Sequence, residues 1–268
     1  MAHWAIAGEQ HSTIGATAID RQSFSNRGWV VLRGRLDPDT VDRISGWIEQ
    51  VSAWADVGGP GLHHFEETGS GPVVARSERF ADDHGDLGRF VRGGVASIVA
   101  DLTGAEAVLF KEKVNYKHPG GGGFAAHQDA TAYRFVEHHT SVMVPLDAAT
   151  VRNGCLWFAP IPASGLLPAS AGRIPADIVD SLEWEPVEVL PGDVVVFDSH
   201  APHRSDTNRS VAPRRAMFLT YNDAILGDFR SAYYADKEAE FASSDGTFGG
   251  ERVRMSVNDD FLGRPVHR

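Results

Sequence analysis

The sequence predicts an α+β domain in which helices cover one face of a mostly antiparallel sheet or barrel. Helical periodicity occupies the first part of the chain. Runs of β-branched and aromatic residues, bounded by Gly, Pro, Asn and Asp, follow it. There is no internal repeat, and no low-complexity linker beyond a run of four glycines. We therefore expect the 268 residues to form a single domain.

The first elements are a short strand and two helices. Residues 29–32 are β-like, and apolar residues then recur at steps of three and four over residues 41–54. Asp37 is the expected N-cap of that helix. A second helix is predicted over residues 86–102, ending before Gly104.

Strands dominate from there onward. The predicted strands cover residues 107–116, 140–147, 193–199 and 215–222. The domain thus divides into a strand-helix region at about 20–104, a barrel core at about 105–225 and a C-terminal extension at about 226–268. From about Tyr234 the pattern is less regular, and we expect a surface extension there.

Charge and composition exclude several classes of partner. The formal net charge is -11, with no run of five like charges. We therefore do not expect the protein to bind nucleic acid or an anionic membrane surface, because both require a cluster of basic residues. The first residues lack a basic and an apolar segment, and no stretch of 18 apolar residues occurs, so no membrane association is expected. Cys155 is the single cysteine, which fits a reducing, cytoplasmic location.

The stretch GGGGFAAHQDATAYRF holds the first candidate metal ligands. In an extended segment His127 and Asp129 point to the same side. Far along the chain, PGDVVVFDSHAPHRSDTN offers His200 and His203. Two histidines and one carboxylate leave open positions on a metal, as in non-haem Fe(II) oxygenases. A keto acid can chelate through two of these positions while O₂ takes the third.

Three segments, HQD, PGDVVVFDSHAPHRSDTN and PRRAMFLTYN, carry a resemblance to a known family. They resemble the phytanoyl-CoA dioxygenase family of Fe(II)/2-oxoglutarate-dependent oxygenases, over roughly residues 110–236. The resemblance implies a double-stranded β-helix (jelly-roll, cupin-like) barrel with N-terminal helices packed on one sheet. It also implies that His127, Asp129 and His203 bind the iron.

The same resemblance implies residues for the 2-oxoglutarate co-substrate. It assigns Arg214, eleven positions past the distal histidine, to the far carboxylate, and Ser205 and Asn115 to the same site. A guanidinium suits this role because it forms two parallel hydrogen bonds with a carboxylate. Arg215 lies on the opposite strand face, so a shift of one residue would exchange the two arginines.

The strand FKEKVNYK predicts a charged lining for the barrel. Its apolar side would be formed by Val108, Phe110, Val114 and Tyr116. Lys111, Lys113 and Asn115 then face the other way. Because buried ammonium groups are costly unless paired, lysines that point inward would bind an anionic co-substrate or substrate. Alternatively, they face solvent on an edge strand.

The glycine run at residues 120–123 is a candidate lid over the metal, and alternatively a flexible turn. Gln128, Tyr133 and Trp157 are further candidates for substrate contact, although Trp157 also fits a packed core. Cys155 lacks an ordered Cys-His arrangement, so we do not expect nucleophilic catalysis.

The substrate is expected to be a small polar metabolite. FKEKxNxKxPGGGGF, APHxSxxN and GDFRSAYYADK resemble the branch that hydroxylates 2-aminoethylphosphonate. The alternatives are a natural-product tailoring oxygenase acting on an aminoglycoside or amino-acid derivative, a zinc hydrolase, and a non-catalytic binding barrel. Retention of Asp129 argues against a halogenase. The sequence leaves the oligomeric state open.

Overall fold

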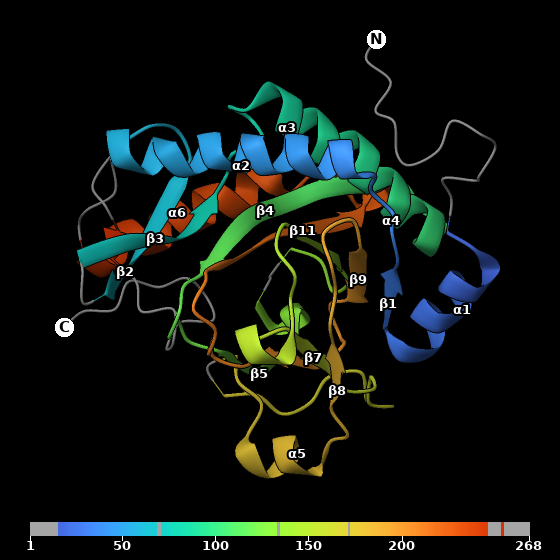
Figure 1. Ribbon diagram of the computed structural model, residues 1–268. Coiled ribbons are helices and arrows are strands. Elements are labelled where there is room, and N and C mark those ends of the chain that lie inside the picture. The colour runs from blue at the N-terminus through green and yellow to red at the C-terminus, as the bar shows by residue number, and fades with distance from the viewer. Residues whose placement is uncertain (1–15, 69–70, 133–134, 171, 246–252, 255–268) are drawn as a thin grey trace.

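The computed structural model describes residues 16–68, 71–132, 135–170, 172–245 and 253–254. Its described strands form two sheets. Most helices lie on the outer side of the larger sheet, which is the face that points away from the smaller sheet (Figure 1). The larger sheet has the order β1-β9-β6-β11-β4-β3-β2-β12, and the smaller has the order β5-β10-β7-β8. This two-sheet architecture confirms the predicted jelly-roll class, although the described strands do not close into a barrel.

The elements have the following bounds. The strands of the larger sheet are β1 (Trp29–Leu32), β2 (Leu62–Thr68), β3 (Gly71–Glu78), β4 (Ala107–Lys117), β6 (Thr140–Pro145), β9 (Val194–Asp198), β11 (Arg214–Asp223) and β12 (Val253–Arg254). Those of the smaller sheet are β5 (Phe124–His127), β7 (Leu156–Phe158), β8 (Glu185–Val187) and β10 (His203–Ser205). The α-helices are α1 (Ala18–Arg27), α2 (Pro38–Val57), α3 (Gly85–Arg89), α4 (Ala96–Thr103), α5 (Ala176–Ser181) and α6 (Arg230–Asp245).

The helices that cover the larger sheet start and stop where the sequence indicates. The Asp37 carboxylate accepts a hydrogen bond from the backbone N of Thr40 at 2.7 Å, and Gly58 ends α2 with φ 64°. The predicted second helix is also confirmed, but a π-helical segment, Phe90–Val95, joins α3 to α4. Gly104 ends α4 in the left-handed conformation.

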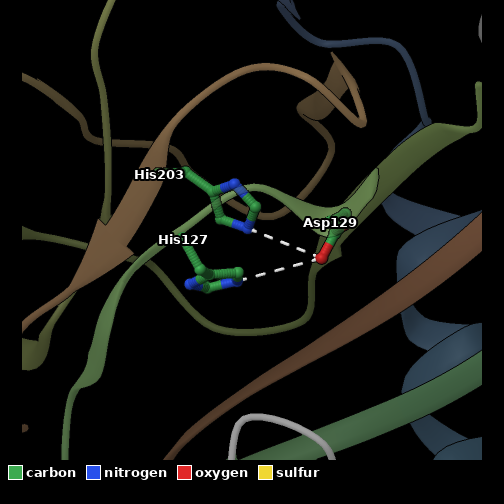
Figure 2. A group of neighbouring side chains, drawn as sticks. All are labelled: His127, Asp129 and His203. Atoms are coloured by element: carbon green, nitrogen blue, oxygen red, sulfur yellow. Dashed lines mark ion pairs between the residues drawn. The ribbon is translucent and has the colours of Figure 1, made fainter. Parts of the chain in front are cut away.

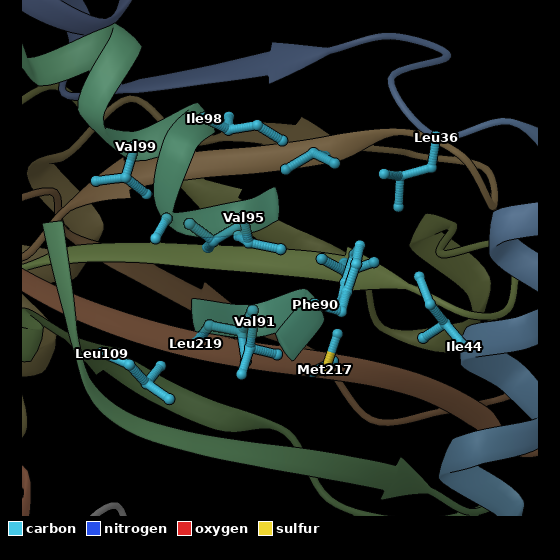
Figure 3. Packing of buried hydrophobic residues seen from close by; sticks show 14 of the residues in the cluster. Leu36, Ile44, Phe90, Val91, Val95, Ile98, Val99, Leu109, Met217 and Leu219 are labelled. Atoms are coloured by element: carbon cyan, nitrogen blue, oxygen red, sulfur yellow. The ribbon is translucent and has the colours of Figure 1, made fainter. Parts of the chain in front are cut away.

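Alternation along the central strands gives each face of the larger sheet its own core. Val142 and Val144 pack toward the helices, whereas Met143 between them packs toward the smaller sheet. On β11 the outer-facing residues include Met217 and Leu219, and Figure 3 shows them beside residues of the helical layer. The inner face of the larger sheet is therefore left to line a space between the two sheets.

The C-terminal region differs from the prediction. Instead of an irregular surface extension, Arg230–Asp245 form α6, which packs on β4, while most of the predicted extension beyond it lies outside the described residues. Tyr234 is buried, and Arg230 forms an ion pair with buried Glu112, with an Nη2–Oε1 distance of 2.8 Å. The sequence pattern missed this helix because its contacts with the sheet are polar as well as apolar.

Among the described residues, no helix combines the length and hydrophobicity needed to cross a membrane.

Candidate metal and co-substrate site

Three side chains converge between the two sheets at the ends of short segments. His127 is the last residue of β5 and His203 is the first of β10, and these two residues are cross-strand partners. Asp129 begins a 3-10 turn, Asp129–Ala132, so the predicted continuous strand ends two residues earlier than expected. The Asp129 Oδ1 atom is 3.8 Å from His127 Nε2 and 3.9 Å from His203 Nε2, as Figure 2 shows.

Hydrogen bonds hold both imidazoles in the tautomer that a metal requires. His127 Nδ1 lies 2.6 Å from the carbonyl oxygen of Ala125, and His203 Nδ1 lies 3.0 Å from that of Ala201. A carbonyl can only accept, so each Nδ1 carries the hydrogen and each Nε2 presents its lone pair to the centre. Burial lowers the pKa of both histidines, which keeps them neutral and able to bind a metal.

Asp129 supplies the negative charge of the cluster. Its second carboxylate oxygen, Oδ2, accepts a hydrogen bond from Ser141 Oγ at 2.8 Å, which fixes the direction of Oδ1. Burial alone would raise the pKa of Asp129, but His203, His127 and nearby lysines outweigh it and hold the pKa well below its usual range. Two neutral imidazoles and one anionic carboxylate fit a divalent iron with open coordination positions.

Arg214 and Arg215 separate as alternation along β11 requires. Arg215 binds the Asp147 carboxylate outside the pocket, with an Nη2–Oδ1 distance of 3.0 Å. Arg214 lines the pocket, is 4 % exposed and donates from Nη2 to the carbonyl oxygen of Gly154 at 3.1 Å. Its Nε and Nη1 atoms are buried without a partner among the described residues. Burial lowers the pKa of Arg214 to about 10, so the guanidinium stays charged and can receive a carboxylate.

The inward-facing residues of β4 line the same pocket. Lys111, Lys113 and Asn115 all border it, so these lysines do not sit on a solvent-facing edge strand. Burial lowers the pKa of Lys111 to about 8, and burial together with neighbouring cations lowers that of Lys113 well below its usual range. Within the described chain, the ammonium group of Lys113 makes no hydrogen bond or ion pair with another residue.

The apolar face predicted for β4 is correct only in part. Val114 and Tyr116 pack against the helical layer as expected, but the third residue from β4 in that core is Leu109. Phe110 contacts the His139 ring, with centroids 4.8 Å apart. The pairing of β4 with β11 shifts register beside this point, and such a bulge reverses the alternation.

Two cations that the sequence analysis did not single out support the predicted polar residues. Arg76 Nε donates to Asn115 Oδ1 at 3.1 Å, and Lys117 Nζ donates to Ser205 Oγ at 2.9 Å. Both Asn115 and Ser205 line the pocket. Lys117 could have been found, because it continues the alternation of the inward-facing β4 residues, whereas nothing in the sequence around Arg76 marks it.

Two further predicted residues, Gln128 and Trp157, do not line the pocket. Gln128 is buried elsewhere, because its amide bonds the backbone of Gly165, Leu167 and His200. Trp157 alternates away from the pocket-lining residues of β7 and lies under the Arg204 guanidinium, 5.5 Å from its ring centroid. Tyr133, also predicted to contact substrate, lies outside the described residues.

The glycine run has a packing role in this structure. Gly120 N donates to the carbonyl oxygen of Asn208 at 2.8 Å, and Asn208 N donates to that of Gly121 at 3.0 Å. A Cβ added at Gly123 would lie 2.3 Å from the carbonyl oxygen of Ser205. The glycines therefore let this loop approach the segment that follows His203, and the predicted lid motion stays a prediction.

Cys155 takes no part in the chemistry of the site. It is buried in the core between the sheets, and burial raises the pKa of its thiol to about 11. The protonated thiol is a poor nucleophile, in agreement with the sequence analysis.

A jelly-roll fold with a two-histidine, one-carboxylate cluster and a buried arginine defines the class of mononuclear non-haem iron oxygenases that use a keto acid. Residues 24–216 match the phytanoyl-CoA dioxygenase (PhyH) family. The chain belongs to this family, which confirms the resemblance seen in its sequence motifs.

Individual relatives agree with this assignment. The methylphosphonate hydroxylase of Gimesia maris is 40 % identical over 261 residues, covering 96 % of this chain and 99 % of the relative. The 2-aminoethylphosphonate dioxygenase of an uncultured bacterium, HF130_AEPn_1, is 34 % identical over 93 % of this chain and 98 % of its own length. The crystal structure of EctD from S. alaskensis with 2-oxoglutarate and 5-hydroxyectoine superposes with a TM-score of 0.65 at 20 % identity, covering 82 % of this chain and 80 % of EctD.

Proposed function

We propose that this protein is an Fe(II)- and 2-oxoglutarate-dependent dioxygenase that hydroxylates a C–H bond of a small alkylphosphonate. The substrate class rests on Lys113, whose ammonium group borders the metal cluster and forms no salt bridge with a carboxylate of the described residues. The family membership and the similarity to a methylphosphonate hydroxylase and a 2-aminoethylphosphonate dioxygenase support the same substrate class.

Charge balance in the pocket favours anionic ligands. Lys111, Lys113, Arg204 and Arg214 line the pocket as basic side chains, and Asp129 is the only carboxylate among the described residues that line it. Burial lowers the pKa of Lys111 and Lys113, so a bound anion would also hold both lysines in their charged form. This excess of basic groups favours two anionic ligands, one 2-oxoglutarate and one phosphonate.

The cations lie at different positions along the paired strands β4 and β11, which separates the two anions. Arg214 pairs with Lys117 at one end of the strand, whereas Lys111 pairs with Thr220 toward the other. Six residues of strand span about 20 Å. We assign 2-oxoglutarate to the Arg214 end, near Ser205 and Lys117, and the phosphonate to Lys111 and Lys113.

The electrostatics around Asp129 support a role for both lysines beside the metal cluster. Both Lys111 and Lys113 are among the charges that lower the pKa of Asp129. A phosphonate held by these ammonium groups would bring the neighbouring carbon toward the metal cluster, and the packed apolar residues Phe197, Phe218 and Leu156 would exclude water from it. When bound, the iron supplies the activation of O₂ at the expense of 2-oxoglutarate, and the protein residues supply position and charge.

The described pocket residues include no free carboxylate that could pair with an amine, and this favours some phosphonates over others. Among the described residues that line the pocket, Asp129 is the only acidic one, and it belongs to the metal cluster. The ammonium group of 2-aminoethylphosphonate, or of an aminoglycoside, would find no anion there. This favours an alkylphosphonate without an amine over the aminoalkylphosphonate that the sequence suggested.

The other readings explain less of the pocket. A zinc hydrolase would leave the unpartnered Nε and Nη1 atoms of Arg214 without a purpose. A non-catalytic binding barrel would retain both anion positions but would not consume 2-oxoglutarate. Turnover therefore separates these alternatives from the oxygenase.

The test is succinate formation by Fe(II)-loaded protein supplied with O₂, 2-oxoglutarate and either methylphosphonate or 2-aminoethylphosphonate. We expect methylphosphonate to stimulate succinate formation more strongly, with a hydroxymethyl product visible by ³¹P NMR. Lys113→Met should lose this stimulation while its affinity for 2-oxoglutarate stays within a few-fold of wild type. Stimulation by the amine alone would refute the choice of substrate, and no succinate with either phosphonate would refute the proposed substrate class.

A further inference from the structure

A second cluster of metal-binding side chains lies outside the catalytic pocket. It consists of His138, Asp198 and His200, whose potential ligand atoms all lie within 4.8 Å of one another. None of the three lines the pocket described above. His138 is exposed, whereas Asp198 and His200 are half-buried, so one side of the cluster is open to solvent.

Strand pairing creates this cluster. Thr140 of β6 is the cross-strand partner of Asp198 of β9. Extending that register by two residues places His138 opposite His200, with Asp198 on the same face two positions away. The two imidazole rings stack, with centroids 4.2 Å apart and an interplanar angle of 29°.

The distances resemble those of the catalytic cluster in the same structure. Asp198 Oδ1 is 3.3 Å from His200 Nδ1, and Asp198 Oδ2 is 3.9 Å from His138 Nδ1. The corresponding separations around Asp129 are 3.8 and 3.9 Å. Ligand atoms bound tetrahedrally to zinc lie about 3.3 Å apart, given metal–nitrogen bonds of about 2.0 Å. Small side-chain movements would therefore bring all three onto one ion.

The carboxylate of this cluster is held in place as a metal ligand requires. Asp198 Oδ1 accepts a hydrogen bond from the backbone N of His200 at 2.7 Å. The backbone N of Asp198 donates to the carbonyl oxygen of Gly28 at 2.8 Å, which ties the turn to the start of β1. Such supporting bonds orient ligands before the ion arrives.

We propose that His138, Asp198 and His200 form a second metal site, which binds a divalent late transition-metal ion such as Zn²⁺. Two imidazoles and one carboxylate favour Zn²⁺, Ni²⁺ or Cu²⁺ over Mg²⁺ and Ca²⁺, which prefer oxygen ligands. Water completes the coordination on the open side. The site shares no ligand with the catalytic cluster, so the proposal does not depend on the proposed reaction.

The site also touches the segment that carries the catalytic ligands. The carbonyl oxygen of His200 accepts from Gln128 Nε2 at 2.6 Å, and that of Ser199 accepts from Ala130 N at 2.9 Å. These two donor residues flank Asp129 in sequence. An ion bound at the second site would make residues 198–200 more rigid, and Gln128 and Ala130 are hydrogen-bonded to this segment.

The experiment measures zinc bound per chain after equilibrium dialysis of the tag-free, full-length protein against micromolar Zn²⁺. We expect two ions per chain in wild type, and one in His138→Ala, whose exposed side chain can be removed without disturbing the core. His118→Ala, which removes a histidine outside both clusters, should retain two.

A second measurement follows affinity and the type of metal. Titration calorimetry with Zn²⁺ should show the weaker of two binding events reduced at least tenfold in Asp198→Asn, and Mg²⁺ should not compete for it. Retention of both ions by His138→Ala, or binding of one ion by wild type, would overturn the proposal.

Discussion

Replacing Arg214 by glutamine tests how the pocket holds 2-oxoglutarate. Two donor atoms of Arg214, Nε and Nη1, are buried at the start of β11 without a partner among the described residues. A carboxylate placed there would accept two charge-assisted hydrogen bonds, each contributing about 1.5–3 kcal/mol. Loss of both corresponds to at least about 3 kcal/mol, or about a 100-fold rise in the dissociation constant.

The assay is anaerobic titration calorimetry of 2-oxoglutarate into Fe(II)-loaded protein. Arg215→Gln is the matched control, since that neighbouring side chain binds Asp147 on the other face. It should lower stability without changing 2-oxoglutarate affinity by more than a few-fold. An Arg214→Gln protein that binds 2-oxoglutarate as tightly as wild type would refute the assignment, as would a large loss in Arg215→Gln alone.

Three further predictions follow from the geometry of the site. Ser141→Ala removes the hydrogen bond that orients the Asp129 carboxylate, so Fe(II) affinity measured by competition with a chelator should fall about 10-fold to 100-fold, and an unchanged affinity would contradict that role. Lys111 has a depressed pKa of about 8, so its positive charge is present below that pH and lost above it; kcat/KM for the phosphonate should fall between pH 7 and pH 9, and Lys111→Met should lack this descent. Gly123→Ala forces a Cβ to within 2.3 Å of the Ser205 carbonyl oxygen, so the midpoint of urea denaturation should drop, whereas an unchanged midpoint would show that the loop can move away.

The sequence alone determined the class of the protein. Local signals specified the N-cap at Asp37, the helix end at Gly104 and the β-character of the central strands, because each depends on neighbouring residues. The metal ligands were also recognisable, since an HxD pair and a distal histidine form a recurring pattern. The motif favoured Arg214 over Arg215, but a shift of one residue would have exchanged them, and the two faces of β11 distinguish the pocket-lining Arg214 from Arg215, which binds Asp147.

Tertiary structure decided what lies beside those residues. Pairing of β4 with β11 introduces the bulge beside Phe110, whose ring contacts His139, and no local pattern signals such an offset. The role of Gln128 as a backbone clamp and the outward position of Trp157 likewise depend on loops and strands distant in sequence. The register between β6 and β9 creates the second histidine cluster from residues about 60 positions apart. Contacts of this kind depend on how the chain packs, so only the folded protein reveals them.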